Sequence, residues 1–325
     1  MSSRFILTLS FSVLAGMSIA LSDANAQTSD VKHTKQATPT LTRFEPQVIQ
    51  TELCPSGVAF DGDTMYISFL GKEYKPTEKD DDGFVGKMVI GKDTEPTMLT
   101  KPTVYAAPKG IAVDKEGIYV TDLDNAYALV KEDGNLDGAI NVSSDLPMTY
   151  LDGLVSLGDG RIIMAARDLN RIYIADTRSM TYAEIVTKIP LNAPSSLAWD
   201  PKKRLLYVAE FASVEKNGKE EPTGRLLSVN ILTGDVTPLE GVAGRKILGK
   251  FSGIAVDGDD VYFSDWTQDG KPEVIRRLEL KSGRVTSVAT QAMRGLVHFV
   301  LRGNQIIAPS VTEKKIYIFD LKKKK

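Results

Sequence analysis

PKGIAVDKEGIYVTD, residues 108–122, contains the pattern on which the fold depends. Gly110 leads into the apolar segment 111–113, a turn of Asp, Lys, Glu and Gly follows, and a second apolar segment begins at residue 118. Short segments rich in Ile, Val and Tyr, bounded by turn formers, predict two strands joined as a β-hairpin. Residues 55–71 (PSGVAFDGDTMYISFLG) and 252–265 (SGIAVDGDDVYFSD) repeat this pattern.

The small residue before the first strand, which we call the anchor, recurs six times at spacings of 42 to 57 residues. The anchors are Gly57, Gly110, Gly153, Ser196, Gly253 and Gly295. Further β-branched and aromatic segments follow at 171–176, 225–230, 274–280 and 315–321. Repeats of about 40 to 50 residues with several short strands are typical of β-propellers, in which small sheets bury their faces against one another. We therefore predict an all-β, six-bladed β-propeller over residues 44–321.

Ring closure and the long insertions can also be predicted. The strand-like segment 44–52 is expected to complete the last blade beside 315–321, which would remove an exposed sheet edge. The insertions 73–86 and 213–224 both follow a second strand of a repeat. We expect them on the same face, where they would shape the mouth of the central channel.

The first 26 residues have the features of a signal peptide. Arg4 precedes an apolar stretch over 5–21, and Ala24-Asn25-Ala26 predicts cleavage before Gln27. Residues 27–43 are polar and are expected to form a flexible leader, and the Lys run 322–325 a solvated tail. These features predict a secreted or periplasmic protein, with no membrane span after signal cleavage.

Composition limits the partners. The chain has 325 residues, a formal charge of −2 and 25% charged residues, so it offers no broad basic surface for nucleic acid. The single cysteine, Cys54, excludes an internal disulfide. We expect a monomer whose partner is a small polar molecule or a peptide or protein.

The segment 108–122 closely resembles an NHL repeat, and the six-unit pattern resembles the SMP-30/gluconolactonase/LRE-like propellers. In lactonases of that group the resemblance implies a divalent metal held over the channel by Glu, Asn and Asp side chains. At the matching positions this chain has Cys54-Pro55-Ser56, Ser195 and Ser252. Serine hydroxyls are poor ligands for a hard dication. No cofactor is therefore predicted, and calcium or zinc held by Asp152, the one acidic residue directly before an anchor, is the alternative.

Residues just before the anchors and just after the second strands are expected to ring the channel mouth. Phe69, Phe211 and Trp266 would be its aromatic members, and Lys109, Arg167 and Arg294 suit carboxylate or phosphate groups. For Asp122, Glu210 and Asp265 the alternative role is to accept hydrogen bonds from turn amides. The predicted ligand-binding residues are Lys109, Asp122, Asp124, Asp152, Arg167, Asp168, Glu210, Asp265, Trp266 and Arg294.

Two other residues receive structural predictions. His298 is expected within an innermost strand, pointing into the channel or the blade interface, and Trp199 is expected to pack between blades. No catalytic residue is predicted. The preferred function is binding of a small polar ligand or a protein partner at the mouth. The alternative is a metal-dependent lactonase or related hydrolase that uses Asp152 with Asp122, Glu210 or Asp265.

Overall fold

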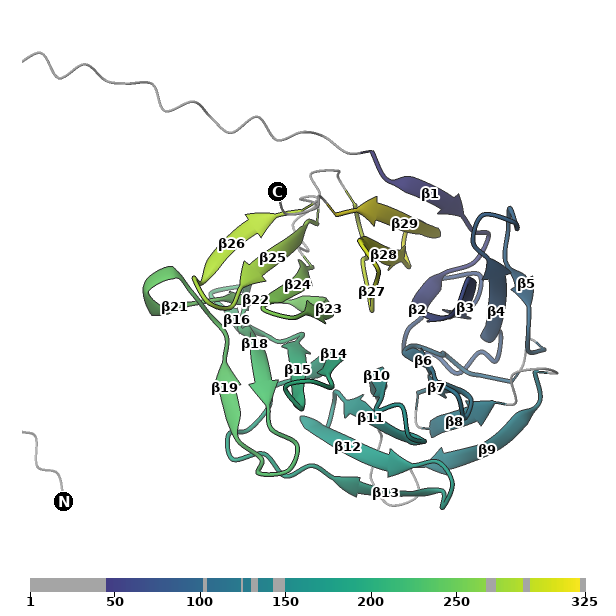
Figure 1. Ribbon diagram of the computed structural model, residues 1–325, viewed down its shortest axis with the longest axis horizontal. Coiled ribbons are helices and arrows are strands. Elements are labelled where there is room, and N and C mark those ends of the chain that lie inside the picture. The colour runs from purple at the N-terminus through teal and green to yellow at the C-terminus, as the bar shows by residue number, and fades with distance from the viewer. Residues whose placement is uncertain are drawn as a thin grey trace, which may run out of the picture. The chain divides into compact units, whose positions relative to one another are not determined.

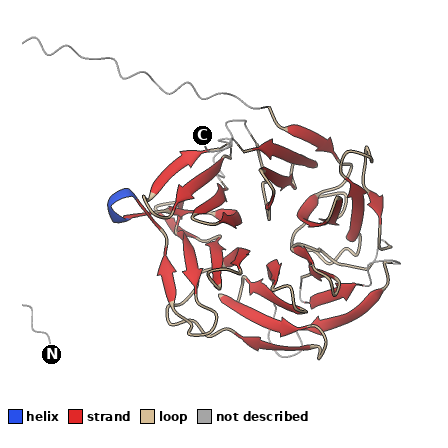
Figure 2. Ribbon diagram, viewed as in Figure 1, coloured by secondary structure: helices blue, strands red, loops and turns tan. Residues whose placement is uncertain are grey.

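The computed structural model describes residues 45–101, 104–123, 125–129, 134–142, 150–266, 273–288 and 293–321. The predicted signal peptide (1–26), leader (27–43) and Lys tail (322–325) lie outside the described residues, as does Asp124. The described residues are almost entirely β-strands and turns (Figure 2). Their one helical element is the short 3-10 helix η1 (Val242–Gly244). Accordingly, the described part of the chain contains no helix with the length and hydropathy needed to span a membrane.

Six antiparallel sheets are arranged around a central axis, which confirms the predicted six-bladed β-propeller (Figure 1). From the innermost strand outward, the first three blades are β2 (Pro55–Asp61), β3 (Thr64–Phe69), β4 (Phe84–Val89) and β5 (Thr97–Met98); β6 (Ile111–Val113), β7 (Ile118–Thr121), β8 (Asn125–Leu129) and β9 (Leu136–Asn141); and β10 (Leu151–Ser156), β11 (Arg161–Ala166), β12 (Arg171–Asp176) and β13 (Thr181–Glu184).

The fourth and fifth blades are β14 (Pro194–Asp200), β15 (Leu205–Glu210), β18 (Gly224–Val229) and β19 (Val236–Pro238), with β22 (Leu248–Gly249) also paired to β18; and β23 (Phe251–Asp257), β24 (Asp260–Asp265), β25 (Ile275–Glu279) and β26 (Arg284–Ser287). Two small hairpins lie beside them: β16 (Ser213–Lys216) with β17 (Lys219–Pro222), and β20 (Glu240–Gly241) with β21 (Arg245–Lys246).

The sixth blade contains both ends of the described chain. It consists of β27 (Val300–Arg302), β28 (Gln305–Ser310), β29 (Lys315–Asp320) and β1 (Gln47–Gln50). Strand β1 pairs antiparallel with β29, with Val48 opposite Tyr317 and Ile49 opposite Ile316. The predicted closure of the ring is therefore confirmed, and β29 has no free edge.

The hydrophobic core is divided among the blade interfaces. Each pair of neighbouring blades shares one cluster of buried apolar side chains, six clusters in all. Between the third and fourth blades, for example, Ile163 and Ile172 pack with Leu206 and Val208, all fully buried. A single blade cannot bury both of its faces, so stability depends on the complete ring.

The inner strands approach one another closely at the anchors. A Cβ atom on Gly110 would lie 2.7 Å from Leu154 N and 2.8 Å from Asp152 O in the next blade. Both contacts are with backbone atoms, which cannot rotate away, so the anchor position requires a residue without a side chain. The channel is consequently narrow at this end.

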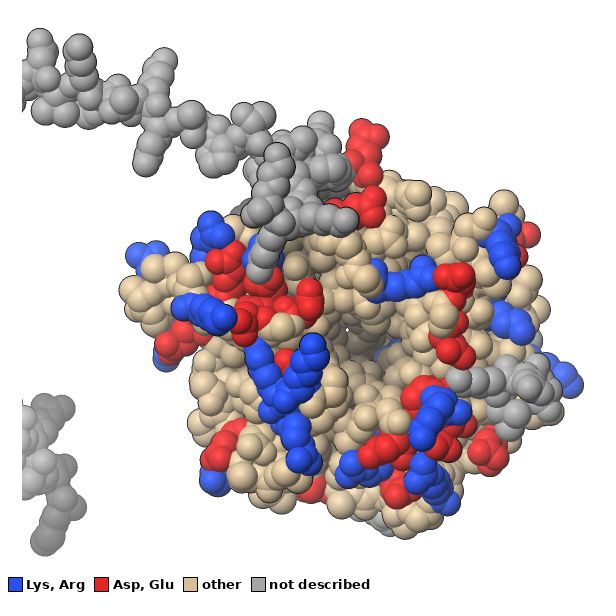
Figure 3. Space-filling model, in the orientation of Figure 1, with Lys and Arg blue, Asp and Glu red and all other residues tan. Residues whose placement is uncertain are grey.

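Beyond the anchors the channel widens into a cavity of about 520 Å³, which extends to turn residues such as Gly158 and Pro201. Figure 3 shows that one face of the disc is hollowed at its centre, with charged side chains grouped around the hollow. The two ends of the channel therefore differ in width, and the narrow end is called the mouth below.

Candidate functional site

Four inner strands aim a polar residue into the mouth by the same local device. Strands β2, β10, β14 and β23 each shift register against their neighbour directly at the anchor. A β-bulge of this kind turns a side chain out of the regular alternation. The residues placed there are Ser56, Asp152, Ser195 and Ser252, all buried and all lining a small pocket of about 40 Å³, the inner pocket.

Asp152 is the centre of a hydrogen-bond network in the inner pocket. Its Oδ2 accepts a hydrogen bond from the Ser195 hydroxyl at 2.9 Å, and its Oδ1 lies 2.8 Å from His298 Nε2. An ionised carboxylate can only accept, so Nε2 donates in this pair. Burial opposes ionisation of Asp152, but His298 and Arg167 outweigh it and hold the pKa of the carboxyl below its ordinary value. Asp152 is therefore a buried anion.

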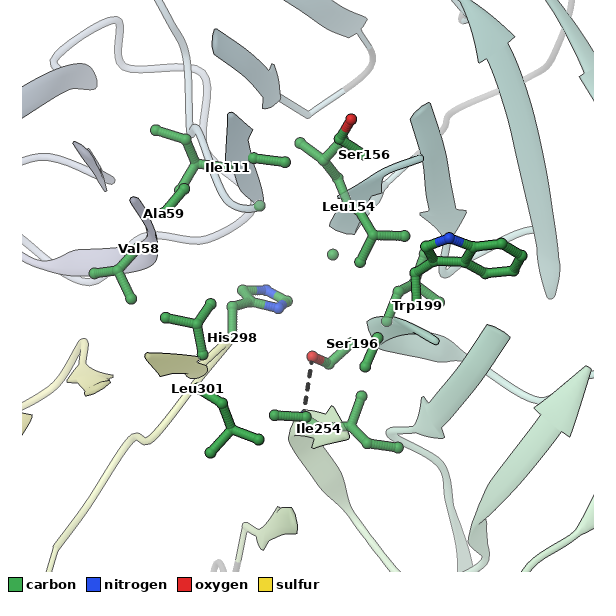
Figure 4. A pocket seen from close by; sticks show the side chains of 18 of the residues that line it. Val58, Ala59, Ile111, Leu154, Ser156, Ser196, Trp199, Ile254, His298 and Leu301 are labelled. Carbon is green, nitrogen blue, oxygen red and sulfur yellow. Dashed lines mark hydrogen bonds between the residues drawn. The ribbon is translucent and has the colours of Figure 1, made fainter. Parts of the chain in front are cut away.

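His298 lies before an innermost strand and not within it, so that part of the prediction was wrong. Strand β27 begins only at Val300, and His298 has a left-handed φ of +34°. A non-glycine residue in this conformation is strained and is typical of functional sites. The ring lies in the centre of the channel, as predicted, where it contacts both the inner pocket and the wide cavity (Figure 4). Its Nδ1 is buried and has no hydrogen-bond partner.

Two cations line the inner pocket. Lys109 is 2% exposed, and its Nζ donates to the carbonyls of Pro76 at 2.7 Å and Ala107 at 3.3 Å. Burial lowers the pKa of Lys109 to about 8. The Arg167 guanidinium lies 3.8 Å from Asp152 and keeps 28% of its side chain exposed. The inner pocket thus holds two cations and one anion among its described side chains.

Aromatic rings surround Arg167 where the inner pocket opens to a vestibule of about 540 Å³. The guanidinium lies 4.2 Å from the ring centroid of Phe211 and 5.4 Å from that of Tyr150, within the range of cation–π attraction. Trp266 packs edge-on against Phe211 at 5.8 Å and lies 6.3 Å from Tyr74. The mouth therefore combines a half-exposed cation with aromatic walls.

Both predicted insertions reach the mouth. Tyr74, Pro76 and Thr77 of the insertion 73–86 line the vestibule. The β16–β17 hairpin of the second insertion supplies Glu220, which pairs at 2.6 Å with Lys250, whose ammonium lies 4.7 Å from the Phe211 ring centroid. The prediction that both insertions emerge on one face at the mouth is confirmed.

The structure brings together half of the predicted ligand-binding residues. Lys109, Asp152, Arg167 and Trp266 line the inner pocket, and Asp168 lines the vestibule with Arg167 and Trp266. Arg294 is exposed and lies outside both cavities, its backbone N–H bonded to Glu313 at 3.0 Å. Phe69, expected at the rim, is 2% exposed and packs on Phe84 instead.

The other acidic residues have a structural role that recurs with the repeat. Asp122 accepts hydrogen bonds from the Ala106 and Ala107 amides, and Asp265 accepts one from the Lys250 amide. Glu210, fully buried, accepts from the Asn192 amide and the Arg225 guanidinium. Each carboxylate secures the segment that leads to the anchor of its own blade, so the turn-amide alternative is confirmed for these three. Asp168 does the same for Tyr150 at 2.7 Å.

Three mouth residues did not enter the predicted set. Tyr74 and Tyr150 lie in connecting segments that have no fixed relation to the repeat. His298 belongs to the one blade whose inner strand starts late. For Asp152 as a metal ligand, no three His, Cys, Asp or Glu side chains lie together as a metal-binding group in the described part of the chain. The neighbours of Asp152 are instead Ser195, His298 and Arg167.

Comparison with known proteins supports the fold alone. No protein-family model and no curated protein matches the chain. Among solved structures, a chain of the nidogen/laminin complex aligns with a TM-score of 0.54 and 18% identity, covering 74% of this chain and 81% of that one. A chain of hydrazine synthase from Kuenenia stuttgartiensis aligns with a TM-score of 0.58 and 16% identity, covering 84% and 78%.

Virginiamycin B lyase from Staphylococcus aureus is also similar. A catalytically inactive variant in which a histidine is replaced by alanine, solved with quinupristin, aligns with a TM-score of 0.57 and 16% identity, covering 86% of this chain and 99% of that one. At such identities these likenesses establish the architecture, which proteins of diverse function share. The chain is a six-bladed β-propeller, and its function has to be argued from its own site.

Proposed function

We propose that this protein binds a small organic anion at the channel mouth, with the anionic group at Arg167 and an apolar or aromatic body in the vestibule. The observation that carries the proposal is the position of Arg167 at the junction of the two cavities, half-exposed and flanked by aromatic rings. A guanidinium offers a planar set of donors that matches a carboxylate or phosphate group.

The electrostatics of the inner pocket support an anionic ligand. Lys109 and Arg167 outnumber Asp152 there, and Asp168 lies only on the more solvated vestibule. Because the inner pocket is narrow and poorly hydrated, its one excess positive charge attracts an anion more strongly than a surface charge would. The walls formed by Tyr74, Phe211 and Trp266 favour a flat apolar body over an extended polar one.

Calorimetric titration with benzoate, and with benzamide as its uncharged counterpart, tests the proposal. We expect benzoate to bind at least tenfold more tightly than benzamide, and Arg167→Gln to remove that preference. Arg294→Gln is the matched control, since Arg294 is exposed and outside both cavities, and it should leave benzoate binding unchanged. Equal affinity for the two ligands, or equal losses in both variants, would rule out Arg167 as the anion site.

Acid–base catalysis at His298 is a second candidate, favoured by the His298–Asp152 pair. A histidine oriented by a buried carboxylate is a common proton-transfer unit. The similarity to a lyase that a histidine replacement inactivates supplies a first substrate to test, quinupristin. The protein should convert quinupristin to a product separable by chromatography, and His298→Ala should not. If the wild-type protein yields no product, catalysis on this substrate is excluded while the binding proposal stands.

A further inference from the structure

A second cavity lies on the other side of His298, separate from the mouth. It is the wide part of the channel, about 520 Å³, a size common for small-molecule sites. All six blades contribute apolar side chains to its wall (Figure 4). These include Val58, Ile111, Leu154, Leu197, Ile254 and Leu301.

The polar side chains of this wall are engaged in the protein. The Ser156 hydroxyl donates to Asp114, and the Ser196 hydroxyl accepts from the Ile254 amide at 3.2 Å. Arg302 pairs with Asp63 at 2.6 Å, and its guanidinium lies 4.8 Å from the ring centroid of Phe60. Among the described side chains that line the cavity, no charge is therefore left without a counter-charge.

Backbone groups add a second character to the wall. Each innermost strand pairs with a neighbour on one side only, so its other edge faces the channel axis. These edges offer N–H and C=O groups at intervals between the apolar side chains. A molecule that fills the cavity gains most if it is uncharged, largely apolar and able to form a hydrogen bond.

We propose that the wide cavity is a second binding site, which takes an uncharged molecule with an apolar body and one hydrogen-bonding group. Water in an apolar cavity finds few partners, so a ligand that displaces it gains the free energy of burying its own apolar surface. His298 separates this site from the anion site, since its ring lines both cavities. The two sites therefore take ligands of different chemistry.

The chain contains a natural reporter for each site. It has two tryptophans: Trp199 lines the wide cavity and Trp266 lines the mouth. Trp199, predicted to pack between blades, does contact the cluster between the third and fourth blades, but it is half-buried and also faces the channel. Each conservative Trp→Phe variant therefore leaves one site with a fluorophore.

The experiment uses N-phenyl-1-naphthylamine, an uncharged apolar dye with one N–H group that accepts excitation energy from tryptophan. Titration into Trp266→Phe should give saturable dye fluorescence with energy transfer from Trp199. Titration into Trp199→Phe should give dye binding with at least threefold weaker transfer, because the remaining tryptophan lies at the mouth.

Two further variants keep the test specific. Val256→Phe enlarges a half-buried side chain of the cavity wall and should weaken dye binding at least tenfold. Arg167→Gln at the mouth should leave it unchanged, whatever its effect on benzoate. The proposal is overturned if the wild-type protein binds no dye, if Val256→Phe binds it as well as wild type, or if energy transfer follows Trp266.

Discussion

The two ends of the channel are built by the same six strands yet differ in almost every physical property. At the mouth the strands touch through their anchors, and bulges turn Asp152 and three serines inward. A few residues further along, the strands separate and present Val, Ile and Leu side chains. One repeat therefore produces a charged, narrow site and an apolar, wide one, because a single bulge changes which side chains face the axis.

The largest expected difference between the ends is in stability. Asp152→Ala leaves Lys109 and Arg167 in the pocket without their counter-charge, and should lower the free energy of unfolding by about 3 kcal/mol or more. Ser156→Ala at the wide end removes one hydrogen bond to Asp114 and should cost about 1 kcal/mol or less. Urea denaturation of both variants measures the contrast. Equal losses would mean that the mouth network has no special energetic weight.

The second prediction concerns Glu273, which holds the segment leading to His298 through the Gly295 and Leu296 amides at 2.7 and 2.9 Å. Burial raises the pKa of Glu273 to about 7 from 4.5. The folded state therefore keeps a proton that the unfolded chain has released between these values. The stability that this carboxyl contributes is full below about pH 4.5 and is lost as the pH rises through about 7.

Glu273→Gln isolates this effect, since glutamine does not titrate. Relative to the variant, the wild-type protein should lose up to about 3 kcal/mol of unfolding free energy between pH 4.5 and pH 7.5. Denaturation curves at several pH values measure the difference. A constant difference between the two proteins across this range would show that Glu273 ionises normally.

A third prediction tests the close approach of the inner strands. Gly110→Ala places a Cβ against two backbone atoms of the next blade and should cost about 2 kcal/mol through forced movement of the strands. At the wide end the half-buried Val113→Thr should change stability by less than about 1 kcal/mol. Thermal unfolding of both variants compares the two ends, and a neutral Gly110→Ala would show that the strands can separate freely at the mouth.

The smallest effect is expected on ligand binding. Since burial lowers the pKa of Lys109 to about 8, this lysine is charged at pH 7 and loses its charge as the pH rises further. Benzoate affinity should therefore fall about tenfold between pH 7 and pH 9. Lys109→Met should bind benzoate with the lower affinity at both pH values. A wild-type affinity that does not change with pH would place Lys109 outside the binding site.

The fold was predictable because the repeat specifies it directly. Each anchor, hairpin and turn is written in local sequence, and the number of anchors gives the number of blades. The rule that residues before the anchors face the mouth located Lys109 and Asp152, since it depends only on the position within a repeat.

The remainder of the site depends on departures from the repeat. His298 reaches the channel because Gly295 adopts a φ of +65° and β27 starts five residues later, a change that no neighbouring repeat announces. Tyr74 and Tyr150 reach the vestibule through the paths of connecting segments, which local sequence does not determine. Asp122 and Glu210 were candidates because they lie next to the mouth in the chain, yet their carboxylates are directed to backbone amides.

The pairing of β1 with β29 has a consequence for biosynthesis. The first strand of the propeller is translated long before its only partner, which ends at Asp320. Until then the ring is open, and the half-made sixth blade leaves apolar edges without neighbours. A nascent chain of this kind cannot complete its fold on the ribosome one blade at a time. Any factor that protects β1 during synthesis should therefore act until the final residues emerge.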